Sequence, residues 1–334
     1  MSRSIAPHIR TEARVAKMMI DILLAAIPLG VFSYVNYGVR PLYLLLLSML
    51  AAIVSEMLCC MMRRRPLTTA LDGSAAVTGL IVGLVMSPMA PYWLPMAGSA
   101  FAIFVVKAPF GGTGRNVFNP AAAGIAVLAY CFPQHMFTYP AISGVEPLPL
   151  GMAVPDTVVT APSLASQISN GVAPQSTPMQ LLLGDFAGPI GTTAGLILLA
   201  FVGYLLVHRT ASAWVVLPYF GTCLVLSWLF PLSWMTPSLS TVAQLSAGYV
   251  LFTGVFLIND PVTAPRFWLG RLVYGVMTAT LVMLLQRVGR SEAAACFAVL
   301  VMNALAPILD RWCWRFWHWG TRLIRFRKEV RAYE

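Results

Sequence analysis

The fold of this chain is decided by one stretch, KAPFGGTGRNVFNPA, which runs from Lys107 to Ala121. It places three glycines, two asparagines, a lysine and an arginine between two strongly apolar segments. Polar backbone groups cannot be left unsatisfied in lipid, so such a break belongs where a protein binds something. A second break, NDPVTAP from Asn259 to Pro265, has the same character. The pattern indicates a membrane protein with polar discontinuities at two related places.

Composition supports this class. Of 334 residues, 58% are hydrophobic and 10% are charged, whereas a water-soluble domain has about 25% charged residues. The net charge of +10 could suggest nucleic acid. The basic residues lie in short gaps between apolar runs, however, which is typical of membrane topology, so we expect no nucleic-acid partner. The six cysteines and four histidines have no metal-ligand spacing, and we expect no metal site.

Apolar runs of about 20 residues predict helical membrane crossings. We expect an all-α integral membrane protein with about ten transmembrane helices. The predicted spans are 18–38, 42–62, 74–90, 92–107, 116–132, 190–208, 212–231, 240–258, 268–286 and 293–310.

The distribution of Lys and Arg predicts the orientation of these helices. With the N-terminus inside, 19 of the 22 basic residues fall in inside segments, and Arg40, Arg287 and Arg290 fall outside. We therefore expect a multi-pass protein of the bacterial inner (cytoplasmic) membrane with both termini in the cytoplasm. The aromatic run Trp312–Trp319, followed by basic residues, predicts a tail anchored in membrane lipid.

An internal duplication is indicated when the chain is shifted by 175 residues. Trp93 then falls on Trp268, and Gly114-Arg115 falls on Gly289-Arg290. Each half has five spans. Because an odd number of crossings starts the second half on the opposite side of the membrane, the halves would be two inverted five-helix repeats with interrupted helices. The predicted regions are a first membrane repeat (1–132), a periplasmic loop (133–189), a second membrane repeat (190–310) and a basic aromatic cytoplasmic tail (311–334).

The first break offers side chains for a ligand. Asn116 and Asn119 are three apart at the start of a predicted span, hence on one face of a helix N-terminus. Amides beside free backbone N–H groups suit a planar, carbonyl-rich ligand or an anion. Gly111 and Gly112 would let the backbone approach it closely. The alternative is that the glycines turn the chain and the asparagines cap the helix; the residues favour neither interpretation.

Three carboxylates lie in or near the apolar segments. Asp260 follows the eighth span, and a carboxylate at such depth is a functional candidate by default. It could equally cap a broken helix and pair with an arginine. Asp21 and Glu56 could line an ion path, although Asp21 is also placed to pair with Lys17 one turn earlier. In an inverted repeat, Asn116, Asn119 and Asp260 could approach one another.

These motifs together resemble the RnfD subunit of Rnf electron-transport complexes and, more distantly, the NqrB subunit of the sodium-pumping quinone reductase. The resemblance covers nearly all of the chain, including the N-terminal Pro7-His8 region. The segments that carry it are DGSAAVTG (72–79), KAPFGGTGRNVFNPA (107–121), NDPVTAP (259–265), Gly270-Arg271 with Tyr274-Gly275, and FAVLVMNALAPILD (297–310).

The resemblance implies a flavoprotein subunit of an ion-translocating ferredoxin:NAD+ oxidoreductase, not active alone, coupled to Na+ or H+ transport. Family members carry FMN joined through its phosphate to a threonine of the outer loop. The matching segment here is Pro174–Pro178 (PQSTP), which maps that threonine to Thr177. It also implies a flavin transferase for maturation and the partner subunits RnfA, RnfB, RnfC, RnfE and RnfG.

A second, noncovalent flavin (riboflavin or FMN) between the spans is also implied. Its candidate binding residues are Asn116, Asn119, Asp260, Gly111 and Gly112. The competing hypothesis is a solute channel or transporter built on the same inverted repeat, without a redox cofactor.

Overall fold

The structure is a computed structural model that describes residues 12–67, 70, 72–112, 114–142, 147–151, 157–289 and 292–333. The Pro7-His8 region and Arg290 lie outside the described residues.

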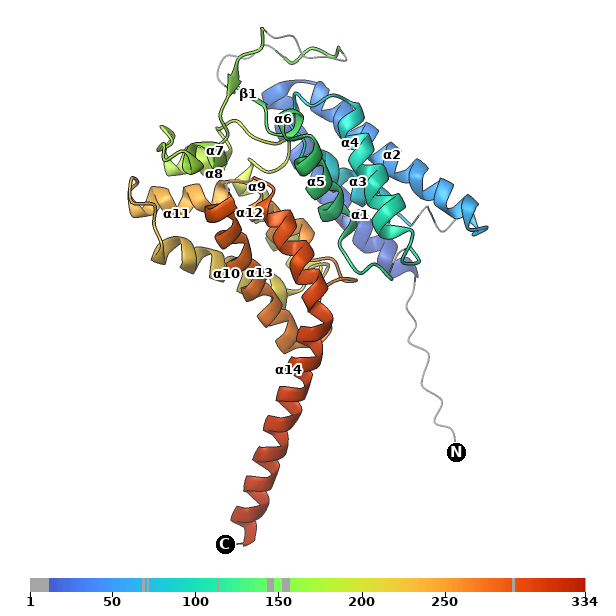
Figure 1. The fold of residues 1–334 in the computed structure, drawn as a ribbon, viewed down its shortest axis with the longest axis vertical. Coiled ribbons are helices and arrows are strands. Elements are labelled where there is room, and N and C mark those ends of the chain that lie inside the picture. The colour runs from blue at the N-terminus through green and yellow to red at the C-terminus, as the bar shows by residue number, and fades with distance from the viewer. Residues whose placement is uncertain are drawn as a thin grey trace.

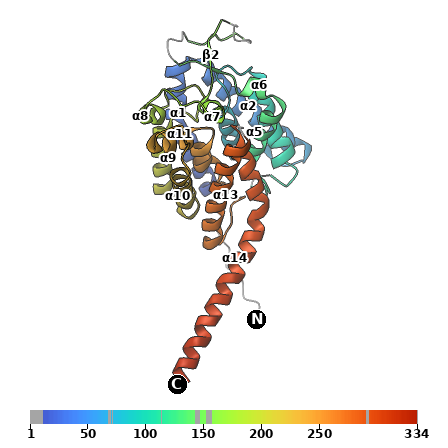
Figure 2. The same cartoon turned by 60° about the vertical axis from the view of Figure 1, so that its left-hand side comes forward.

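The described chain is helical apart from two short paired strands (Figures 1 and 2). The first membrane region holds α1 (Glu12–Tyr37), α2 (Arg40–Met62), α3 (Ser74–Leu84), α4 (Trp93–Phe101), the π-helical η2 (Ala102–Lys107) and α5 (Pro120–Cys131). The loop after it holds α6 (Pro133–Met136), β1 (Tyr139–Pro140), β2 (Thr160–Ala161), α7 (Leu164–Ser169) and α8 (Pro178–Leu183). The second membrane region holds α9 (Gly195–Val207), α10 (Ala213–Leu229), α11 (Pro237–Ser246), α12 (Val250–Phe252), the π-helical η3 (Thr253–Leu257), α13 (Trp268–Gly289) and α14 (Ala294–Tyr333).

Each predicted span contains a helix, but many of these helices are shorter than predicted. Within the described residues, 4 helices are long and apolar enough to cross a membrane, and a bent pair, Pro237–Ser246 with Val250–Leu257, makes up to 5. The two parts of that pair meet at 59°. Five other apolar helices have 10–17 residues, and an 11-residue helix such as α3 is only about 16 Å long at 1.5 Å per residue. The chain is a multi-pass membrane protein with several interrupted helices.

The end of α3 shows how an interrupted helix is closed. The helix stops at Leu84, short of the predicted residue 90. The carbonyls of Leu84 and Met86 instead accept hydrogen bonds from the backbone N–H groups of Gly191 and Ile190, at 2.7 and 3.0 Å. The turn before α9 therefore satisfies polar groups that a broken helix leaves open.

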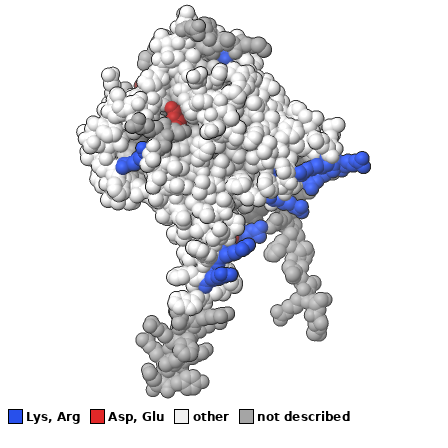
Figure 3. All heavy atoms as spheres, viewed as in Figure 1, with Lys and Arg blue, Asp and Glu red and all other residues white. Residues whose placement is uncertain are grey.

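The loop that follows α5 is tied to the ends of α1 and α2. Leu148 donates its backbone N–H to the carbonyl of Tyr37 at 3.1 Å. The fully buried Arg40 donates to the carbonyls of Pro149 and Gly151, at 3.0 and 2.6 Å. On the face drawn in Figure 3, most Lys and Arg lie away from the outer loop, toward the end of the molecule from which the α14 tail projects. This asymmetry agrees with the predicted orientation, which stays a prediction.

The outer loop has its own packing against the second membrane region. Leu164 of α7 and Leu181 of α8 form a small buried cluster with Ala243 of α11 and Ala247. The strands pair antiparallel, with Tyr139 opposite Ala161. The part of the loop that holds α7 and α8 is thus folded against α11.

Corresponding elements of the two halves begin at related positions. Trp93 begins α4 and Trp268 begins α13, as the 175-residue shift requires. The inverted relationship of the two halves, and the region boundaries that follow from it, stay predictions.

Close packing of α3 against α2 gives a stability test at Gly79. A Cβ at this position would lie 2.5 Å from the carbonyl oxygen of Ser48 and 2.7 Å from the Cα of Met49. Forcing backbones apart costs about 1–3 kcal/mol, so Gly79→Ala should lower the thermal unfolding midpoint in detergent.

The matched control is Gly203→Ala on α9, where nothing lies within 4 Å of an added Cβ. That change should be neutral or stabilising by up to about 1 kcal/mol. Equal midpoints for the two variants would contradict the α2–α3 contact.

Candidate functional site

The two polar breaks meet at one cavity between the membrane regions. Its volume is about 420 Å³, within the range of small-molecule sites. Asn116, Asn119, Asn259 and Asp260 contribute to its wall. The rest comes from loop residues and from the helices α1, α3, η2, α5, α9 and η3, through residues that include Met18, Met19, Ile22, Ser74, Val77, Thr78, Lys107, Ala121, Leu205, Val255 and Phe256.

Asn119 has two roles in this cavity. Its side-chain oxygen accepts the backbone N–H of Ala122 at 3.2 Å and caps α5. Its amide nitrogen donates to the carbonyl of Leu257, the last residue of η3, at 2.9 Å. The capping interpretation of this residue is confirmed, and the same side chain joins the two breaks and lines the cavity.

The predicted helical placement of Asn116 is wrong. The helix α5 begins at Pro120, after three glycines with positive φ, so Asn116 lies in the loop before it. Asn116 still lines the cavity, and its buried Oδ1 has no hydrogen-bond partner within the described structure. Asn259 donates its amide N–H to the carbonyls of Gly254 and Val255, and its Oδ1 is likewise unpartnered there.

The glycines of the first break serve mainly to turn the chain. Gly111 and Gly112 have φ of 114° and 88°, in the region that favours glycine. Neither contributes to the cavity wall, whereas Gly114 does. The carbonyl of Gly111 accepts a hydrogen bond from the Arg65 guanidinium at 2.9 Å.

Asp260 closes the second break. Its carboxylate accepts the backbone N–H of Val262 at 3.0 Å and the hydroxyl of Thr263 at 3.2 Å. Among the described residues it forms no ion pair with an arginine. The structure therefore supports the capping alternative and also places Asp260 at the cavity wall.

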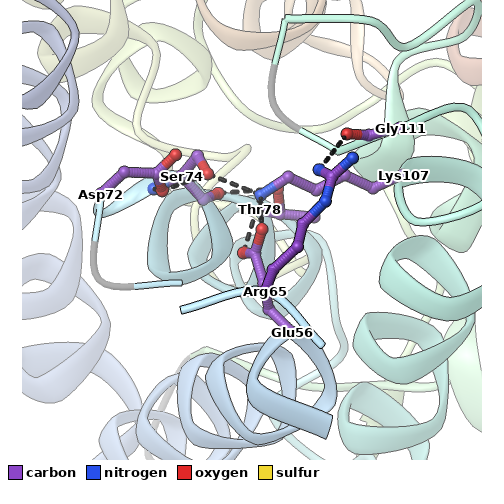
Figure 4. Close-up of polar contacts among 7 residues, drawn as sticks. All are labelled: Glu56, Arg65, Asp72, Ser74, Thr78, Lys107 and Gly111. Atoms are coloured by element: carbon purple, nitrogen blue, oxygen red, sulfur yellow. Dashed lines mark hydrogen bonds and ion pairs between the residues drawn. The ribbon is translucent and has the colours of Figure 1, made fainter. Parts of the chain in front are cut away.

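A buried ion pair lies beside the cavity (Figure 4). The Lys107 ammonium is 2.6 Å from Glu56 Oε1 and donates to the hydroxyl of Ser74 at 2.5 Å. The Ser74 hydroxyl in turn donates to Asp72 at 2.5 Å. Lys107 itself lines the cavity. In the sequence analysis, Lys107 indicated only the topology, and Glu56 was a candidate for an ion path. The structure pairs them, because an ammonium and a carboxylate that are buried in apolar surroundings each need an opposite charge.

A second cavity, of about 840 Å³, adjoins the first. The two share Met18, Thr210, Ala211, Asn259 and Pro261 in their walls. Asp21 lines the second cavity and accepts the hydroxyl of Thr210 at 3.1 Å. Its expected pairing with Lys17 is wrong, because the described residues contain no such ion pair. Basic residues at this opening include Lys17, Arg209 and Arg271.

Thr177 lies apart from both cavities, at the start of α8 in the outer loop. It is exposed, and its hydroxyl accepts the backbone N–H of Gln180 at 3.3 Å. The Gln180 side chain accepts the Thr177 backbone N–H at 2.8 Å, completing a capping box. An exposed hydroxyl on a fixed backbone is accessible to a modifying enzyme.

Sequence reasoning did not identify Glu292, which anchors the outer loop. This buried carboxylate accepts the hydroxyl of Tyr139 at 2.6 Å and also the hydroxyl of Ser163. Ser163 caps α7, and Glu292 precedes α14, so the contact joins the outer loop to the membrane region. Burial raises the pKa of Glu292 above its ordinary value of 4.5.

The fold and the site together define a multi-pass membrane protein with a polar-lined cavity where two interrupted helices meet. The pattern of the NQR2, RnfD, RnfE family matches residues 2–315, so this chain belongs to that family. The predicted resemblance is confirmed.

Curated relatives match over most of their own length. One relative is a protein of Halorhodospira halophila that is named as the D component of an ion-translocating oxidoreductase complex. It is 32% identical to this chain, and the alignment covers 93% of this chain and 94% of the relative. One of Clostridium ljungdahlii, named as the D component of a proton-translocating ferredoxin:NAD(+) oxidoreductase complex, is 29% identical, covering 92% and 93%. One of Stutzerimonas stutzeri, with the same name as the first, is 31% identical, covering 90% and 91%.

The raised pKa of Glu292 predicts a pH dependence. The folded protein holds this proton more tightly than the unfolded chain, so the resulting stability is present below pH 4.5 and is lost as pH rises through the raised pKa. Glu292→Gln should remove this loss, which thermal unfolding midpoints measured from pH 4.5 to neutrality will check.

Asp185→Asn, at an exposed carboxyl of the same loop, is the control and should leave the pH profile unchanged. If the thermal midpoints of wild type and Glu292→Gln changed with pH in the same way, Glu292 would not control the anchoring of the loop.

Proposed function

We propose that this chain is the RnfD-type membrane component of an ion-translocating ferredoxin:NAD+ oxidoreductase complex, in which it relays electrons through two flavins. Support comes from the family match and from the relatives' names. The coupled ion is Na+ or H+, and the protein works with the other Rnf subunits rather than alone.

The observation that carries the proposal is the pair of unpartnered amide oxygens, Asn116 Oδ1 and Asn259 Oδ1, on residues that line one cavity. A buried polar atom without a partner is costly, so a ligand with an N–H donor would stabilise the site. The edge of a flavin ring presents an N–H between two carbonyls. The cavity residues fit that group, since amide N–H groups and the apolar wall are also present.

The residues of this chain would hold the noncovalent flavin (riboflavin or FMN) from two sides. Asn116 would orient the polar edge of the ring through its unpartnered Oδ1, and Asn119, which holds the two breaks together, would form the wall beside it. Val77, Ile81 and Phe256 would exclude water from the faces of the ring. Bound flavin supplies one-electron redox chemistry. Lys107 places a positive charge at the wall, partly offset by Glu56.

The second flavin is FMN attached covalently at Thr177. A flavin transferase would move an FMN group from a flavin dinucleotide to Thr177 Oγ1. The pyrophosphate bond of the donor breaks and its nucleoside monophosphate leaves. The hydroxyl loses its proton, and a phosphodiester forms. The exposure of this threonine and its fixed capping-box backbone support the assignment. Because α8 packs on α11 through Leu181, the attached group would stay close to the membrane regions.

Thr177→Ala should abolish covalent flavin, because the only proposed attachment oxygen is removed. The measurement is flavin fluorescence of the denatured chain on a gel, after expression with the flavin transferase. Ser176→Ala, one residue away, is the control and should keep the signal. A Thr177→Ala chain with full covalent fluorescence would refute the assignment.

Asn116→Leu should weaken the noncovalent site, because it removes a hydrogen-bond acceptor that the flavin N–H requires. Loss of one such bond corresponds to roughly tenfold weaker binding. The readout is flavin released into the supernatant on denaturation, measured in the Thr177→Ala background. Asn170→Leu, at an exposed position of the outer loop, is the control.

Unchanged released flavin in Asn116→Leu would contradict the proposed role of Asn116. No released flavin in the parent chain, together with solute uptake by the protein in liposomes, would favour the transporter hypothesis instead.

A further inference from the structure

A basic pocket lies where α13 begins beside α14, and it shares Arg266 with the wall of the cavity described above. Its volume is about 610 Å³, and it opens at the molecular surface. Arg266 precedes α13, and Arg311 and Arg315 are on α14. The remaining lining residues are Phe267, Asp310 and Trp314.

The three guanidinium groups of this pocket are available to an anion. Arg266, Arg311 and Arg315 are exposed and form no ion pair within the described part of the chain. The carboxylate of Asp310 is engaged elsewhere, since its two oxygens accept the backbone N–H groups of Arg266 and Phe267, each at 2.9 Å. That contact fixes α14 to the start of α13 and holds the arginines together.

Aromatic side chains place the pocket at a membrane surface. Trp268 lies 5.3 Å from Trp214 and 5.3 Å from Trp317, between ring centroids, so three helices bring tryptophan to one level. Tryptophan is enriched at the headgroup level of bilayers. Arg266 and Arg315 are each two residues from one of these tryptophans.

The aromatic residues of α14 distinguish lipid from a docked protein. Trp312 and Trp314 are 66% and 53% exposed and point about 200° apart around the helix at 100° per residue. Phe316 and Trp319 are exposed as well. A helix that docks on one protein partner presents one apolar face, whereas a helix that passes through headgroups meets lipid on every side.

We propose that Arg266, Arg311 and Arg315 form a binding site for the phosphate of an anionic phospholipid. Arginine suits this role because its planar fork pairs bidentately with phosphate oxygens. Trp314 forms the wall of the pocket near the lipid glycerol, and the acyl chains lie along the apolar surfaces of α13 and α14. Basic pockets between membrane helices bind headgroups of this kind.

The test compares two triple variants of the full-length chain in detergent. One is Arg266→Gln with Arg311→Gln and Arg315→Gln. The control, Arg322→Gln with Arg325→Gln and Arg327→Gln, removes the same charge from the distal part of the tail. Native mass spectrometry measures binding of diphosphatidylglycerol, with phosphatidylcholine as the neutral reference.

The pocket variant should bind diphosphatidylglycerol at least ~10-fold more weakly than wild type, with phosphatidylcholine binding and the thermal midpoint unchanged. The tail variant should bind like wild type, and inorganic phosphate should not displace the lipid. Equal weakening in both variants would indicate general charge attraction and overturn the site, as would wild-type affinity in the pocket variant. Loss of bound lipid when the chain assembles with its partner subunits would assign the surface to a protein partner instead.

Discussion

The side chain of Asn119 closes two helix ends at once, and the arrangement around the cavity depends on it. Its oxygen caps α5 and its nitrogen binds the last carbonyl of η3. Hydrocarbon offers no hydrogen bonds, so a helix can stop at membrane depth only where protein groups satisfy its end. Because Asn119 satisfies one end from each break, the two breaks must lie together. The cavity is the space that this constraint leaves between them.

The same rule applies to charge. Lys107 and Glu56 are 51 residues apart in sequence and neutralise each other beside the cavity. Removing one partner of such a pair costs about 3–5 kcal/mol, because the remaining charge stays buried. The pair thus holds α2 to η2 and keeps the charge near the cavity balanced. Arg40 is buried and holds the outer loop by donating hydrogen bonds to backbone carbonyls. Among the described residues, no carboxylate pairs with it.

Local sequence patterns predicted the membrane class, the location of the helices in the two membrane regions and the polar breaks, but not the short helices α6, α7 and α8 of the outer loop. They predicted lengths less well, because α3 ends where a distant segment satisfies its carbonyls and α5 begins only after the glycine-rich turn. Asn119 was identified as a candidate from its own motif, but its partner Leu257 is 138 residues away. The contact of Glu292 with Tyr139 spans 153 residues. The internal duplication predicted that the two breaks could approach one another, but not which atoms meet there, and the contact of Glu292 has no signal in one sequence.

The shared wall of the two cavities has a consequence for maturation. Lys17, at the opening of the second cavity, and Tyr37, against the outer loop, lie 20 residues apart on α1, which corresponds to about 30 Å of helix. A small molecule in the second cavity, which Lys17 and Arg209 line, would lie beside Asn259 in the shared wall, and the outer loop contributes no residue to that cavity among those described. Insertion of the proposed buried flavin and attachment of FMN at Thr177 would therefore be independent events, at opposite ends of the protein and in either order.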